Sequence, residues 1–126
     1  MRATCDGEKI KIRLHCIDAP EMAQRPWGRE SRDHLRRITP ATIRLRRLDR
    51  DRYGRIVGEV YSGTDTAGRE PLNLAMVSAG QAAVYWRYCS DGRYLDAERR
   101  ARDAGRGVWA RSGEQQQPWV WRHGRS

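Results

Sequence analysis

The segment from Lys9 to Ile17 restricts most strongly what this chain can fold into, because its residues alternate between apolar and polar. The apolar set is Ile10, Ile12, Leu14 and Cys16, and the polar set is Lys11, Arg13 and His15. Successive side chains of a strand point to opposite sides, so the pattern predicts a half-buried strand. The pair Asp6-Gly7 before it favours a two-residue hairpin turn. We therefore expect Met1–Cys5 to form an antiparallel partner strand.

The rest of the chain is expected to hold three helices and further strands. The expected helices are Trp27–Ile38, Pro71–Ala79 and about Arg93–Ala104, each ended by proline or glycine. Alternation predicts strands at Thr42–Leu48 and Arg55–Tyr61, and the aromatic segment Ala82–Tyr88 is expected to be another alternating strand. This order of elements describes an α+β fold, a small antiparallel β-barrel flanked by three helices.

The size and charge of the chain fit one domain with a polyanionic partner. Its 126 residues allow one real core, and 25 basic residues against 16 acidic ones give a formal charge of +9. Most of the basic residues are arginine, which suits bidentate contact with phosphate. Codon usage in a GC-rich genome explains such a composition equally well. No apolar run is long enough to span a bilayer, so we expect no membrane segment and no signal peptide.

The cysteines and histidines show no spacing typical of a metal site. Cys89 can form a single disulfide with either Cys5 or Cys16, and the odd count leaves at least one thiol unpaired. The compartment is therefore open, and both a secreted and a cytoplasmic location fit. The histidines are expected to be ordinary surface residues: His15, His34 and His123.

A first candidate for chemistry stands at the end of the alternating segment, where Arg13 is followed by Asp18-Ala19-Pro20-Glu21. A strand end can aim three charges into one cleft. Asp18 is suited to hold a hard divalent cation through oxygen, and Glu21 to orient or deprotonate a water beside phosphorus. The competing interpretation is a plain turn at Asp18 and Pro20 with a solvated Arg13.

A second candidate is the run from Asp49 to Arg55, where Gly54 allows a tight turn and Arg55 opens the next strand. Charge builds on phosphate oxygens during phosphoryl transfer, and two arginines on opposite sides would stabilise it. Taken alone, this run reads more simply as a charged hairpin whose acids and bases neutralise one another on the surface.

Taken together, the two segments closely resemble the staphylococcal nuclease-like (thermonuclease) family. The matching stretches are Arg13–Glu21, Asp51–Arg55, Leu72–Ala75, Gly80–Ala82, Tyr85–Tyr88 and the last helix to Trp109. The resemblance implies an OB-like barrel with helices and calcium-dependent hydrolysis of DNA and RNA with little sequence preference. It implies a nuclease domain over residues 1–110. In the remaining tail, residues 111–126, the run from Gln115 to Pro118 before Trp119 and Trp121 predicts a loop followed by an aromatic anchor.

The resemblance also implies roles for individual residues. Arg13 and Arg55 match the phosphate-binding arginines, Glu21 the presumed general base, and Asp18 a calcium ligand, with Ala19 offering its backbone carbonyl. Residues expected to contact nucleotides are Arg52, Tyr53, Trp86 and Tyr88. In an alternating strand Trp86 and Tyr88 share a face and Tyr85 points the other way. The competing interpretation is that these rings pack in the core or at its rim, which is the commoner fate of aromatic residues.

One part of the family pattern is missing from this sequence. Members usually begin with a strand and an Asp-Gly-Asp-Thr turn that carries a second metal carboxylate, so Asp18 is expected to be the main one here. We expect weaker calcium binding and an exposed barrel edge, hence a monomer or an edge-paired dimer. The leading hypothesis is an endonuclease. A noncatalytic nucleic-acid-binding module of the same fold is the alternative, and a protein-interaction domain is a third.

Overall fold

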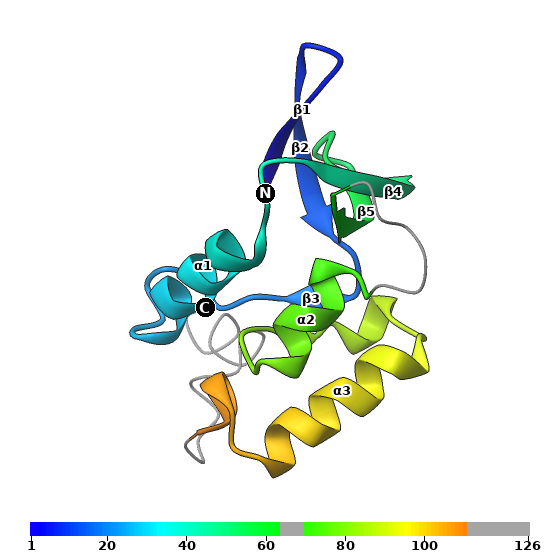
Figure 1. Ribbon diagram of the computed structural model, residues 1–126. Helices are drawn as coiled ribbons and strands as arrows, with labels where there is room; N and C mark the ends of the chain where they lie inside the picture. Colours follow the sequence, from blue (N-terminus) through cyan, green and yellow to red (C-terminus); the bar gives the residue numbers. More distant parts are fainter. Residues whose placement is uncertain (64–69, 111–126) are drawn as a thin grey trace.

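The structure is a computed structural model that describes residues 1–63 and 70–110, and it has the expected α+β architecture. Figure 1 shows the four strands of the main sheet gathered at one end of the molecule and the helices toward the other, with one short strand beside the helices. The strands are β1 (Arg2–Cys5), β2 (Glu8–Leu14), β3 (Ile17–Asp18), β4 (Ile43–Arg50), β5 (Ile56–Ser62) and β6 (Ala83–Val84). The helices are α1 (Trp27–Ile38), α2 (Leu72–Ser78) and α3 (Gly92–Asp103), with short 3-10 turns η1 (Trp86–Tyr88) and η2 (Gly107–Trp109).

The main sheet has four strands in the order β1-β2-β5-β4, and β3 pairs separately with β6. Within the described residues this sheet stays open instead of closing into the expected barrel. The expectation of a wholly antiparallel arrangement is also wrong, because β2 runs parallel to β5. Parallel neighbours need a long crossover, and α1 and β4 provide it.

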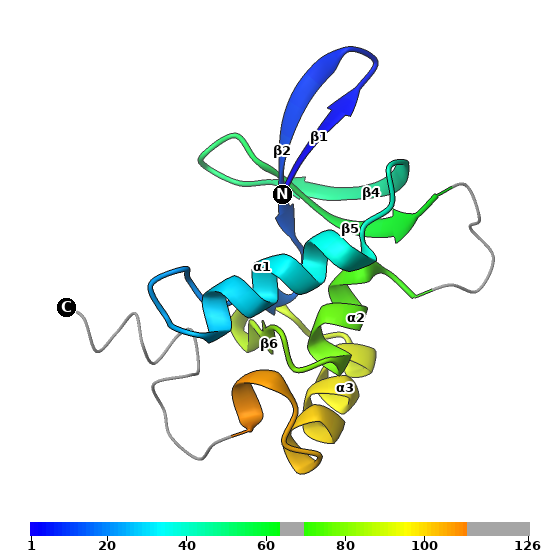
Figure 2. The same ribbon diagram turned by 60° about the vertical axis from the view of Figure 1, so that its left-hand side comes forward.

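The N-terminal hairpin forms as the sequence predicts. Asp6 and Gly7 both have positive φ, 51° and 81°, as the favoured two-residue hairpin turn requires. β1 and β2 are antiparallel, and Cys5 faces Glu8 across the turn. In Figures 1 and 2 the tip of this hairpin extends beyond the rest of the molecule.

The strand expected to continue to Ile17 ends earlier, at Leu14. Cys16 has a φ of 70°, a left-handed conformation that no regular strand contains. The chain therefore turns at His15 and Cys16, and Ile17 and Asp18 pair with Val84 and Ala83 of β6. Because of this turn, Arg13 and Asp18 belong to two different sheets.

The three helices begin and end within about two residues of their expected limits. α1 covers the expected residues, and its partly buried Leu35 and Ile38 pack on the core. The buried face of α3 consists of Tyr94, Ala97 and Ala101. Gly80 follows α2 with a φ of 73°, so it supplies the left-handed residue that commonly ends a helix.

The aromatic segment departs most from expectation. Only Ala83 and Val84 of Ala82–Tyr88 are in a strand, and Trp86–Tyr88 forms a 3-10 turn. The alternation that was expected to separate Tyr85 from Tyr88 is therefore absent. Tyr85 and Tyr88 lie three residues apart around a turn of about three residues, so their rings come to the same side.

A disulfide joins Cys16 to Cys89, which selects one of the two pairings that the sequence left open. Both cysteines are buried, and Cys5 is an exposed thiol outside the bridge. The bridge ties the turn after β2 to the end of η1. The expected tail over 111–126, its aromatic anchor and His123 lie outside the described residues.

Candidate active site

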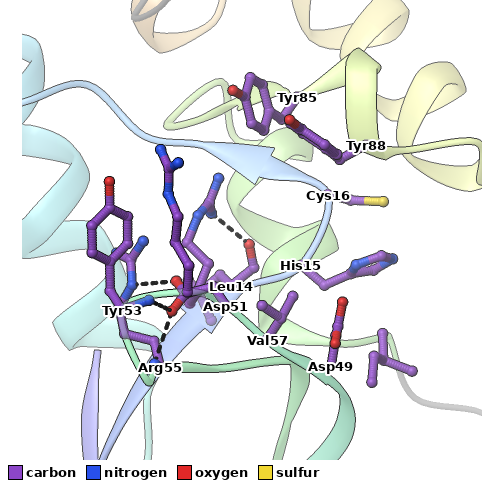
Figure 3. Close-up of a pocket in the computed structure, with 13 residues that line it drawn as sticks. Leu14, His15, Cys16, Asp49, Asp51, Tyr53, Arg55, Val57, Tyr85 and Tyr88 are labelled. Carbon is purple, nitrogen blue, oxygen red and sulfur yellow. Dashed lines mark hydrogen bonds and ion pairs between the residues drawn. The ribbon is translucent and has the colours of Figure 1, made fainter.

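A hollow of about 580 Å³ lies where the end of β2 meets the β4–β5 turn and the Tyr85–Tyr88 segment. This size falls within the usual range of small-ligand sites, roughly 300–1,000 Å³. Arg13, Arg52 and Arg55 line it, together with the rings of three tyrosines. Figure 3 shows Tyr85 and Tyr88 together on one side, and Tyr53, Asp51 and Arg55 on the other.

Strand register explains why the two predicted arginines meet. Arg13 of β2 stands opposite Val57 of β5, and Arg55 lies two residues before Val57. Alternate residues of an extended chain point to one side, and residues in register on neighbouring strands share a face. Arg13, Arg55 and Val57 therefore face the same way, and all three line the hollow.

Arg13 is held in place by the turn that ends its strand. Its Nη1 donates hydrogen bonds to the carbonyl oxygens of Leu14 and Ile17, at 2.8 and 2.7 Å. Those carbonyls converge because the chain turns at His15 and Cys16. The guanidinium carbon also lies 5.7 Å from the centre of the Tyr85 ring, within cation–π range.

Arg55 is held by a carboxylate from the preceding turn. Its Nε donates to Asp51 Oδ2 at 2.6 Å, and its backbone N–H donates to Asp51 Oδ1 at 2.9 Å. Desolvation acts to raise the pKa of the Asp51 carboxyl, but hydrogen bonds from Arg55 and from the Tyr53 N–H outweigh it and hold the pKa below its usual range. Arg55 thus stays oriented at neutral pH, while its side chain remains 40% exposed.

The predicted carboxylates occupy a neighbouring segment and do not line this hollow. Asp18 is buried in β3 at 4% exposure, and Ala19 and Glu21 are half-buried. The backbone of Glu21 is fixed by Gln24, whose N–H donates to the Glu21 carbonyl at 2.8 Å. That same carbonyl touches Gly28 of α1 so closely that no larger residue fits there. Two tight backbone contacts therefore position Glu21.

The oxygen donors for a hard cation are few. Within residues 1–63 and 70–110, no three side chains of histidine, cysteine, aspartate or glutamate come together to hold a metal. Asp18, the Ala19 carbonyl and Glu21 offer the right ligand type for calcium, which takes six to eight oxygens. By donor type these residues suit calcium, and its remaining ligands would be water or substrate oxygens.

The aromatic side of the hollow includes a residue that the sequence interpretation set aside. The rings of Tyr85 and Tyr88 lie 4.9 Å apart, and both line the hollow. Trp86, expected beside Tyr88, is 65% exposed and is not among the lining residues. The only sequence feature that could have identified Tyr85 is its spacing of three residues from Tyr88. That spacing puts two side chains on the same side of a 3-10 turn but on opposite sides of a strand.

His15 and a buried glutamate were also missed. His15 lines the hollow and meets the ring of Tyr94 edge-on, with centroids 6.4 Å apart. Glu59, 2% exposed, accepts a hydrogen bond from Tyr94 Oη at 2.7 Å and pairs with Arg46 and Arg93, each at 3.3 Å. Burial of the Tyr94 hydroxyl raises its pKa, and the hydrogen bond to Glu59 raises the pKa further. The network fastens the first turn of α3 to the sheet beside the site.

Comparisons with known proteins show which family the sequence matches. A family model described as "Staphylococcal nuclease homologue" matches residues 11–111. An "Uncharacterized endonuclease" of Escherichia coli is 38% identical over 115 residues, covering 90% of this chain and 71% of that protein. A "Micrococcal nuclease" of Shigella flexneri is 33% identical over 122 residues, covering 91% and 69%. A "Probable staphylococcal-like nuclease CAN3" of Oryza sativa subsp. japonica is 36% identical over 117 residues, covering 92% and 29%.

Proposed function

The chain belongs to the staphylococcal nuclease homologue family, and from this premise we propose that it is an endonuclease acting on DNA and RNA. The proposed reaction is calcium-dependent hydrolysis of phosphodiester bonds with little sequence preference.

Among the helices of the described residues, none is both long and apolar enough to cross a bilayer.

One observation carries the proposal: Arg13 of β2 and Arg55, immediately before β5, face one hollow, and each is already oriented. A phosphoryl group in its transition state spreads negative charge over its oxygens, and catalysis depends on positioned positive groups. Donors fixed before the substrate arrives need no reorganisation during the reaction. Two preoriented arginines are therefore suited to hold a phosphodiester while it is attacked.

The neighbouring segment is proposed to supply the attack. Glu21 would take a proton from the attacking water, and Asp18 with the Ala19 carbonyl would hold calcium. Calcium, when bound, would neutralise charge on the phosphate oxygens. The hydrogen bond from the Gln24 N–H fixes the backbone of Glu21, which supports this role.

Nucleotide contacts are proposed for the residues around the rim. Arg52 and Tyr53 come from the β4–β5 turn and Tyr88 from η1, and Tyr85 joins them in the hollow. Stacking on an aromatic face is open to every base, so these rings favour single strands without reading sequence. Trp86 would contact only nucleotides that lie outside the hollow.

A noncatalytic nucleic-acid-binding module is the second candidate. The observation that favours it is the small number of acidic ligands gathered within residues 1–63 and 70–110. Such a protein would keep the arginines and rings but would not hydrolyse. A dimer formed through the outer edge of β1 would be compatible with either candidate.

Incubation of the purified chain with plasmid DNA, single-stranded DNA and RNA tests the proposal, in calcium and in a calcium chelator. We expect cleavage of all three in calcium only, with binding in both conditions. A mock preparation from cells that lack the gene controls for contaminating nuclease. Binding without cleavage in either condition would establish the noncatalytic alternative, and failure to bind at low salt would exclude both.

A further inference from the structure

The outer face of the β1–β2 hairpin carries positive charges that the proposed site does not use. Arg2 stands opposite Lys11, and Thr4 stands opposite Lys9, so these four residues share one face. All four are exposed. The opposite face carries Ala3 and Ile10, which pack against a hydrophobic cluster. The hairpin therefore has an apolar inner face and a cationic outer face.

The placement of these cations is unfavourable for folding alone. Like charges directly opposite each other on neighbouring strands destabilise a sheet. Arg2 and Lys11 form such a pair. In addition, Lys9 and Lys11 are the only lysines among the 25 basic residues of the chain, and both fall on this face. A polyanion laid along the hairpin would convert the repulsion into attraction.

The cationic face continues directly into the proposed active site. Lys9, Lys11 and Arg13 are alternate residues of one strand, so their side chains lie on the same side. Strand geometry places neighbours in this series about 6.7 Å apart, and Lys9 about 13 Å from Arg13. A hollow of about 520 Å³ lies along the hairpin, and its lining consists of Arg2, Lys9 and Lys11 together with Ala3, Thr4 and Ile10. One line of cations thus leads from the hairpin tip to Arg13.

We propose that Arg2, Lys9 and Lys11, here called the hairpin cationic stripe, bind the backbone phosphates of nucleic acid next to the phosphate held by Arg13 and Arg55. This inference rests on the proposed function and extends its substrate to strands of several nucleotides. The acidic residues that lie nearest in the sequence do not cancel the stripe, because Asp6 lies in the turn at the tip and Glu8 falls on the opposite face. Both are exposed.

The stripe distinguishes long substrates from short ones. A dinucleotide whose single phosphodiester lies at Arg13 cannot reach Lys9, given a separation of about 13 Å along the strand. A longer single strand can place successive phosphates over Lys11 and Lys9. The stripe should therefore raise affinity for oligonucleotides and leave dinucleotide cleavage unchanged.

The first test is the double variant Lys9→Gln/Lys11→Gln, bound to a single strand of about twelve nucleotides in chelator. If each lysine contacts one phosphate, the slope of log affinity against log salt should become shallower by about 1.4. The matched control is Arg99→Gln/Arg100→Gln, which removes the same charge from exposed positions on α3, at the far end of the molecule from the hairpin (Figure 1). Its salt slope should stay close to that of the parent chain.

The second test uses the scarcity of lysine and needs no variant. An amine-specific reagent modifies only Lys9, Lys11 and the chain's α-amino group, and mass spectrometry reads each site. We expect the oligonucleotide to protect both lysines and the dinucleotide to leave Lys9 unprotected. The double variant Lys9→Gln/Lys11→Gln from the first test serves as a check on folding. Its unfolding midpoint should equal or exceed that of the parent chain, because the like-charge pair of Arg2 and Lys11 is removed.

The outcomes separate the two proposals. If the parent chain binds and cleaves the oligonucleotide, but the lysine variant matches the α3 control and neither lysine is protected, the stripe is overturned and the proposed function stands. Equal loss for dinucleotide and oligonucleotide would also overturn the stripe, because it would place the lysines within the catalytic site. If the parent chain binds no nucleic acid, the proposed function fails first.

Discussion

The arginine hollow and the carboxylate segment lie on the two sides of one turn, yet they are built differently. The guanidinium groups of Arg13 and Arg55 are held by carbonyl oxygens and by Asp51. The carboxylate segment offers a buried Asp18 and a half-buried Glu21, in a described chain where no three metal-ligating side chains meet. Under the proposed function, the difference means that phosphate recognition would be preorganised, whereas hydrolysis would depend on a cation and a water that come from solution. Binding and cleavage should therefore respond to different substitutions.

The substitution Glu21→Gln should separate them most widely. Removing a general base lowers kcat by about 10²–10⁴-fold, while the arginine hollow is untouched. The dissociation constant for a single-stranded oligonucleotide should change by no more than about twofold, which is the size of effect that a surface substitution usually has. Single-turnover rates and fluorescence anisotropy measure the two quantities. A variant that cleaves normally would remove Glu21 from the mechanism.

The disulfide should affect both regions together, because Cys16 lies between Arg13 and Asp18 and Cys89 follows Tyr88. The double variant Cys16→Ser/Cys89→Ser should lower the free energy of unfolding by about 2–4 kcal/mol, since the bridge closes a long loop. Urea denaturation measures the loss, and the nuclease assay should show activity falling at the same time. The control Cys5→Ser alters an exposed thiol outside the bridge and should change neither. An unchanged midpoint in the double variant would mean that the bridge adds no stability.

The substitution Gly28→Ala should disturb the carboxylate segment alone. A methyl group at this position would collide with the backbone of Glu21 and Met22. Overpacking of this kind costs about 1–3 kcal/mol, and the shift in Glu21 should reduce kcat more than affinity. Gly92→Ala is the matched control, since nothing lies within 4 Å of the added atom. Affinity falling in parallel with kcat would show that the two regions are coupled more tightly than their contacts indicate.

The smallest effect is expected from Asp51→Asn, which loosens Arg55 and the Tyr53 backbone N–H that also donates to Asp51. The substitution should raise KM several-fold with little effect on Glu21. Because the folded pKa of Asp51 lies below its usual 3.8, the stability from this carboxylate is fully present above that value and is lost as pH falls through the folded pKa. Urea unfolding across pH should show the variant and the parent differing at neutral pH and converging in acid. A difference that persists in acid would assign the effect to packing rather than charge.

Much of the fold could be predicted because local patterns and tertiary structure agree. The hairpin turn at Asp6-Gly7 and the helix Trp27–Ile38 are both confirmed. The early end of β2 could not be predicted, since it depends on the left-handed conformation of Cys16, which the Cys16–Cys89 bridge accompanies. Alternation in the sequence continues through that turn, so the pattern alone extends the strand too far.

The candidate site was predictable where residues share a strand face, and not where they meet through loops. Arg13 and Arg55 were identified from their spacing and the family resemblance, and the register of β2 and β5 brings them together. Tyr85 was missed because the 3-10 turn reverses the expected facing. Glu59 was missed because a glutamate within a strand is expected to face solvent. In the structure, Tyr94 and its arginine partners cover it.

The most direct test of the central claim is the calcium-supported cleavage rate of a single-stranded oligonucleotide by the parent chain, by Arg13→Ala and by Arg55→Ala. Each substitution removes one positioned donor and should lower kcat/KM by about 10²–10³-fold. The control Arg99→Ala removes an arginine of a surface ion pair on α3 and should retain parental activity. If either arginine of the hollow can be replaced with no more loss than this control, the hollow is not the site of hydrolysis.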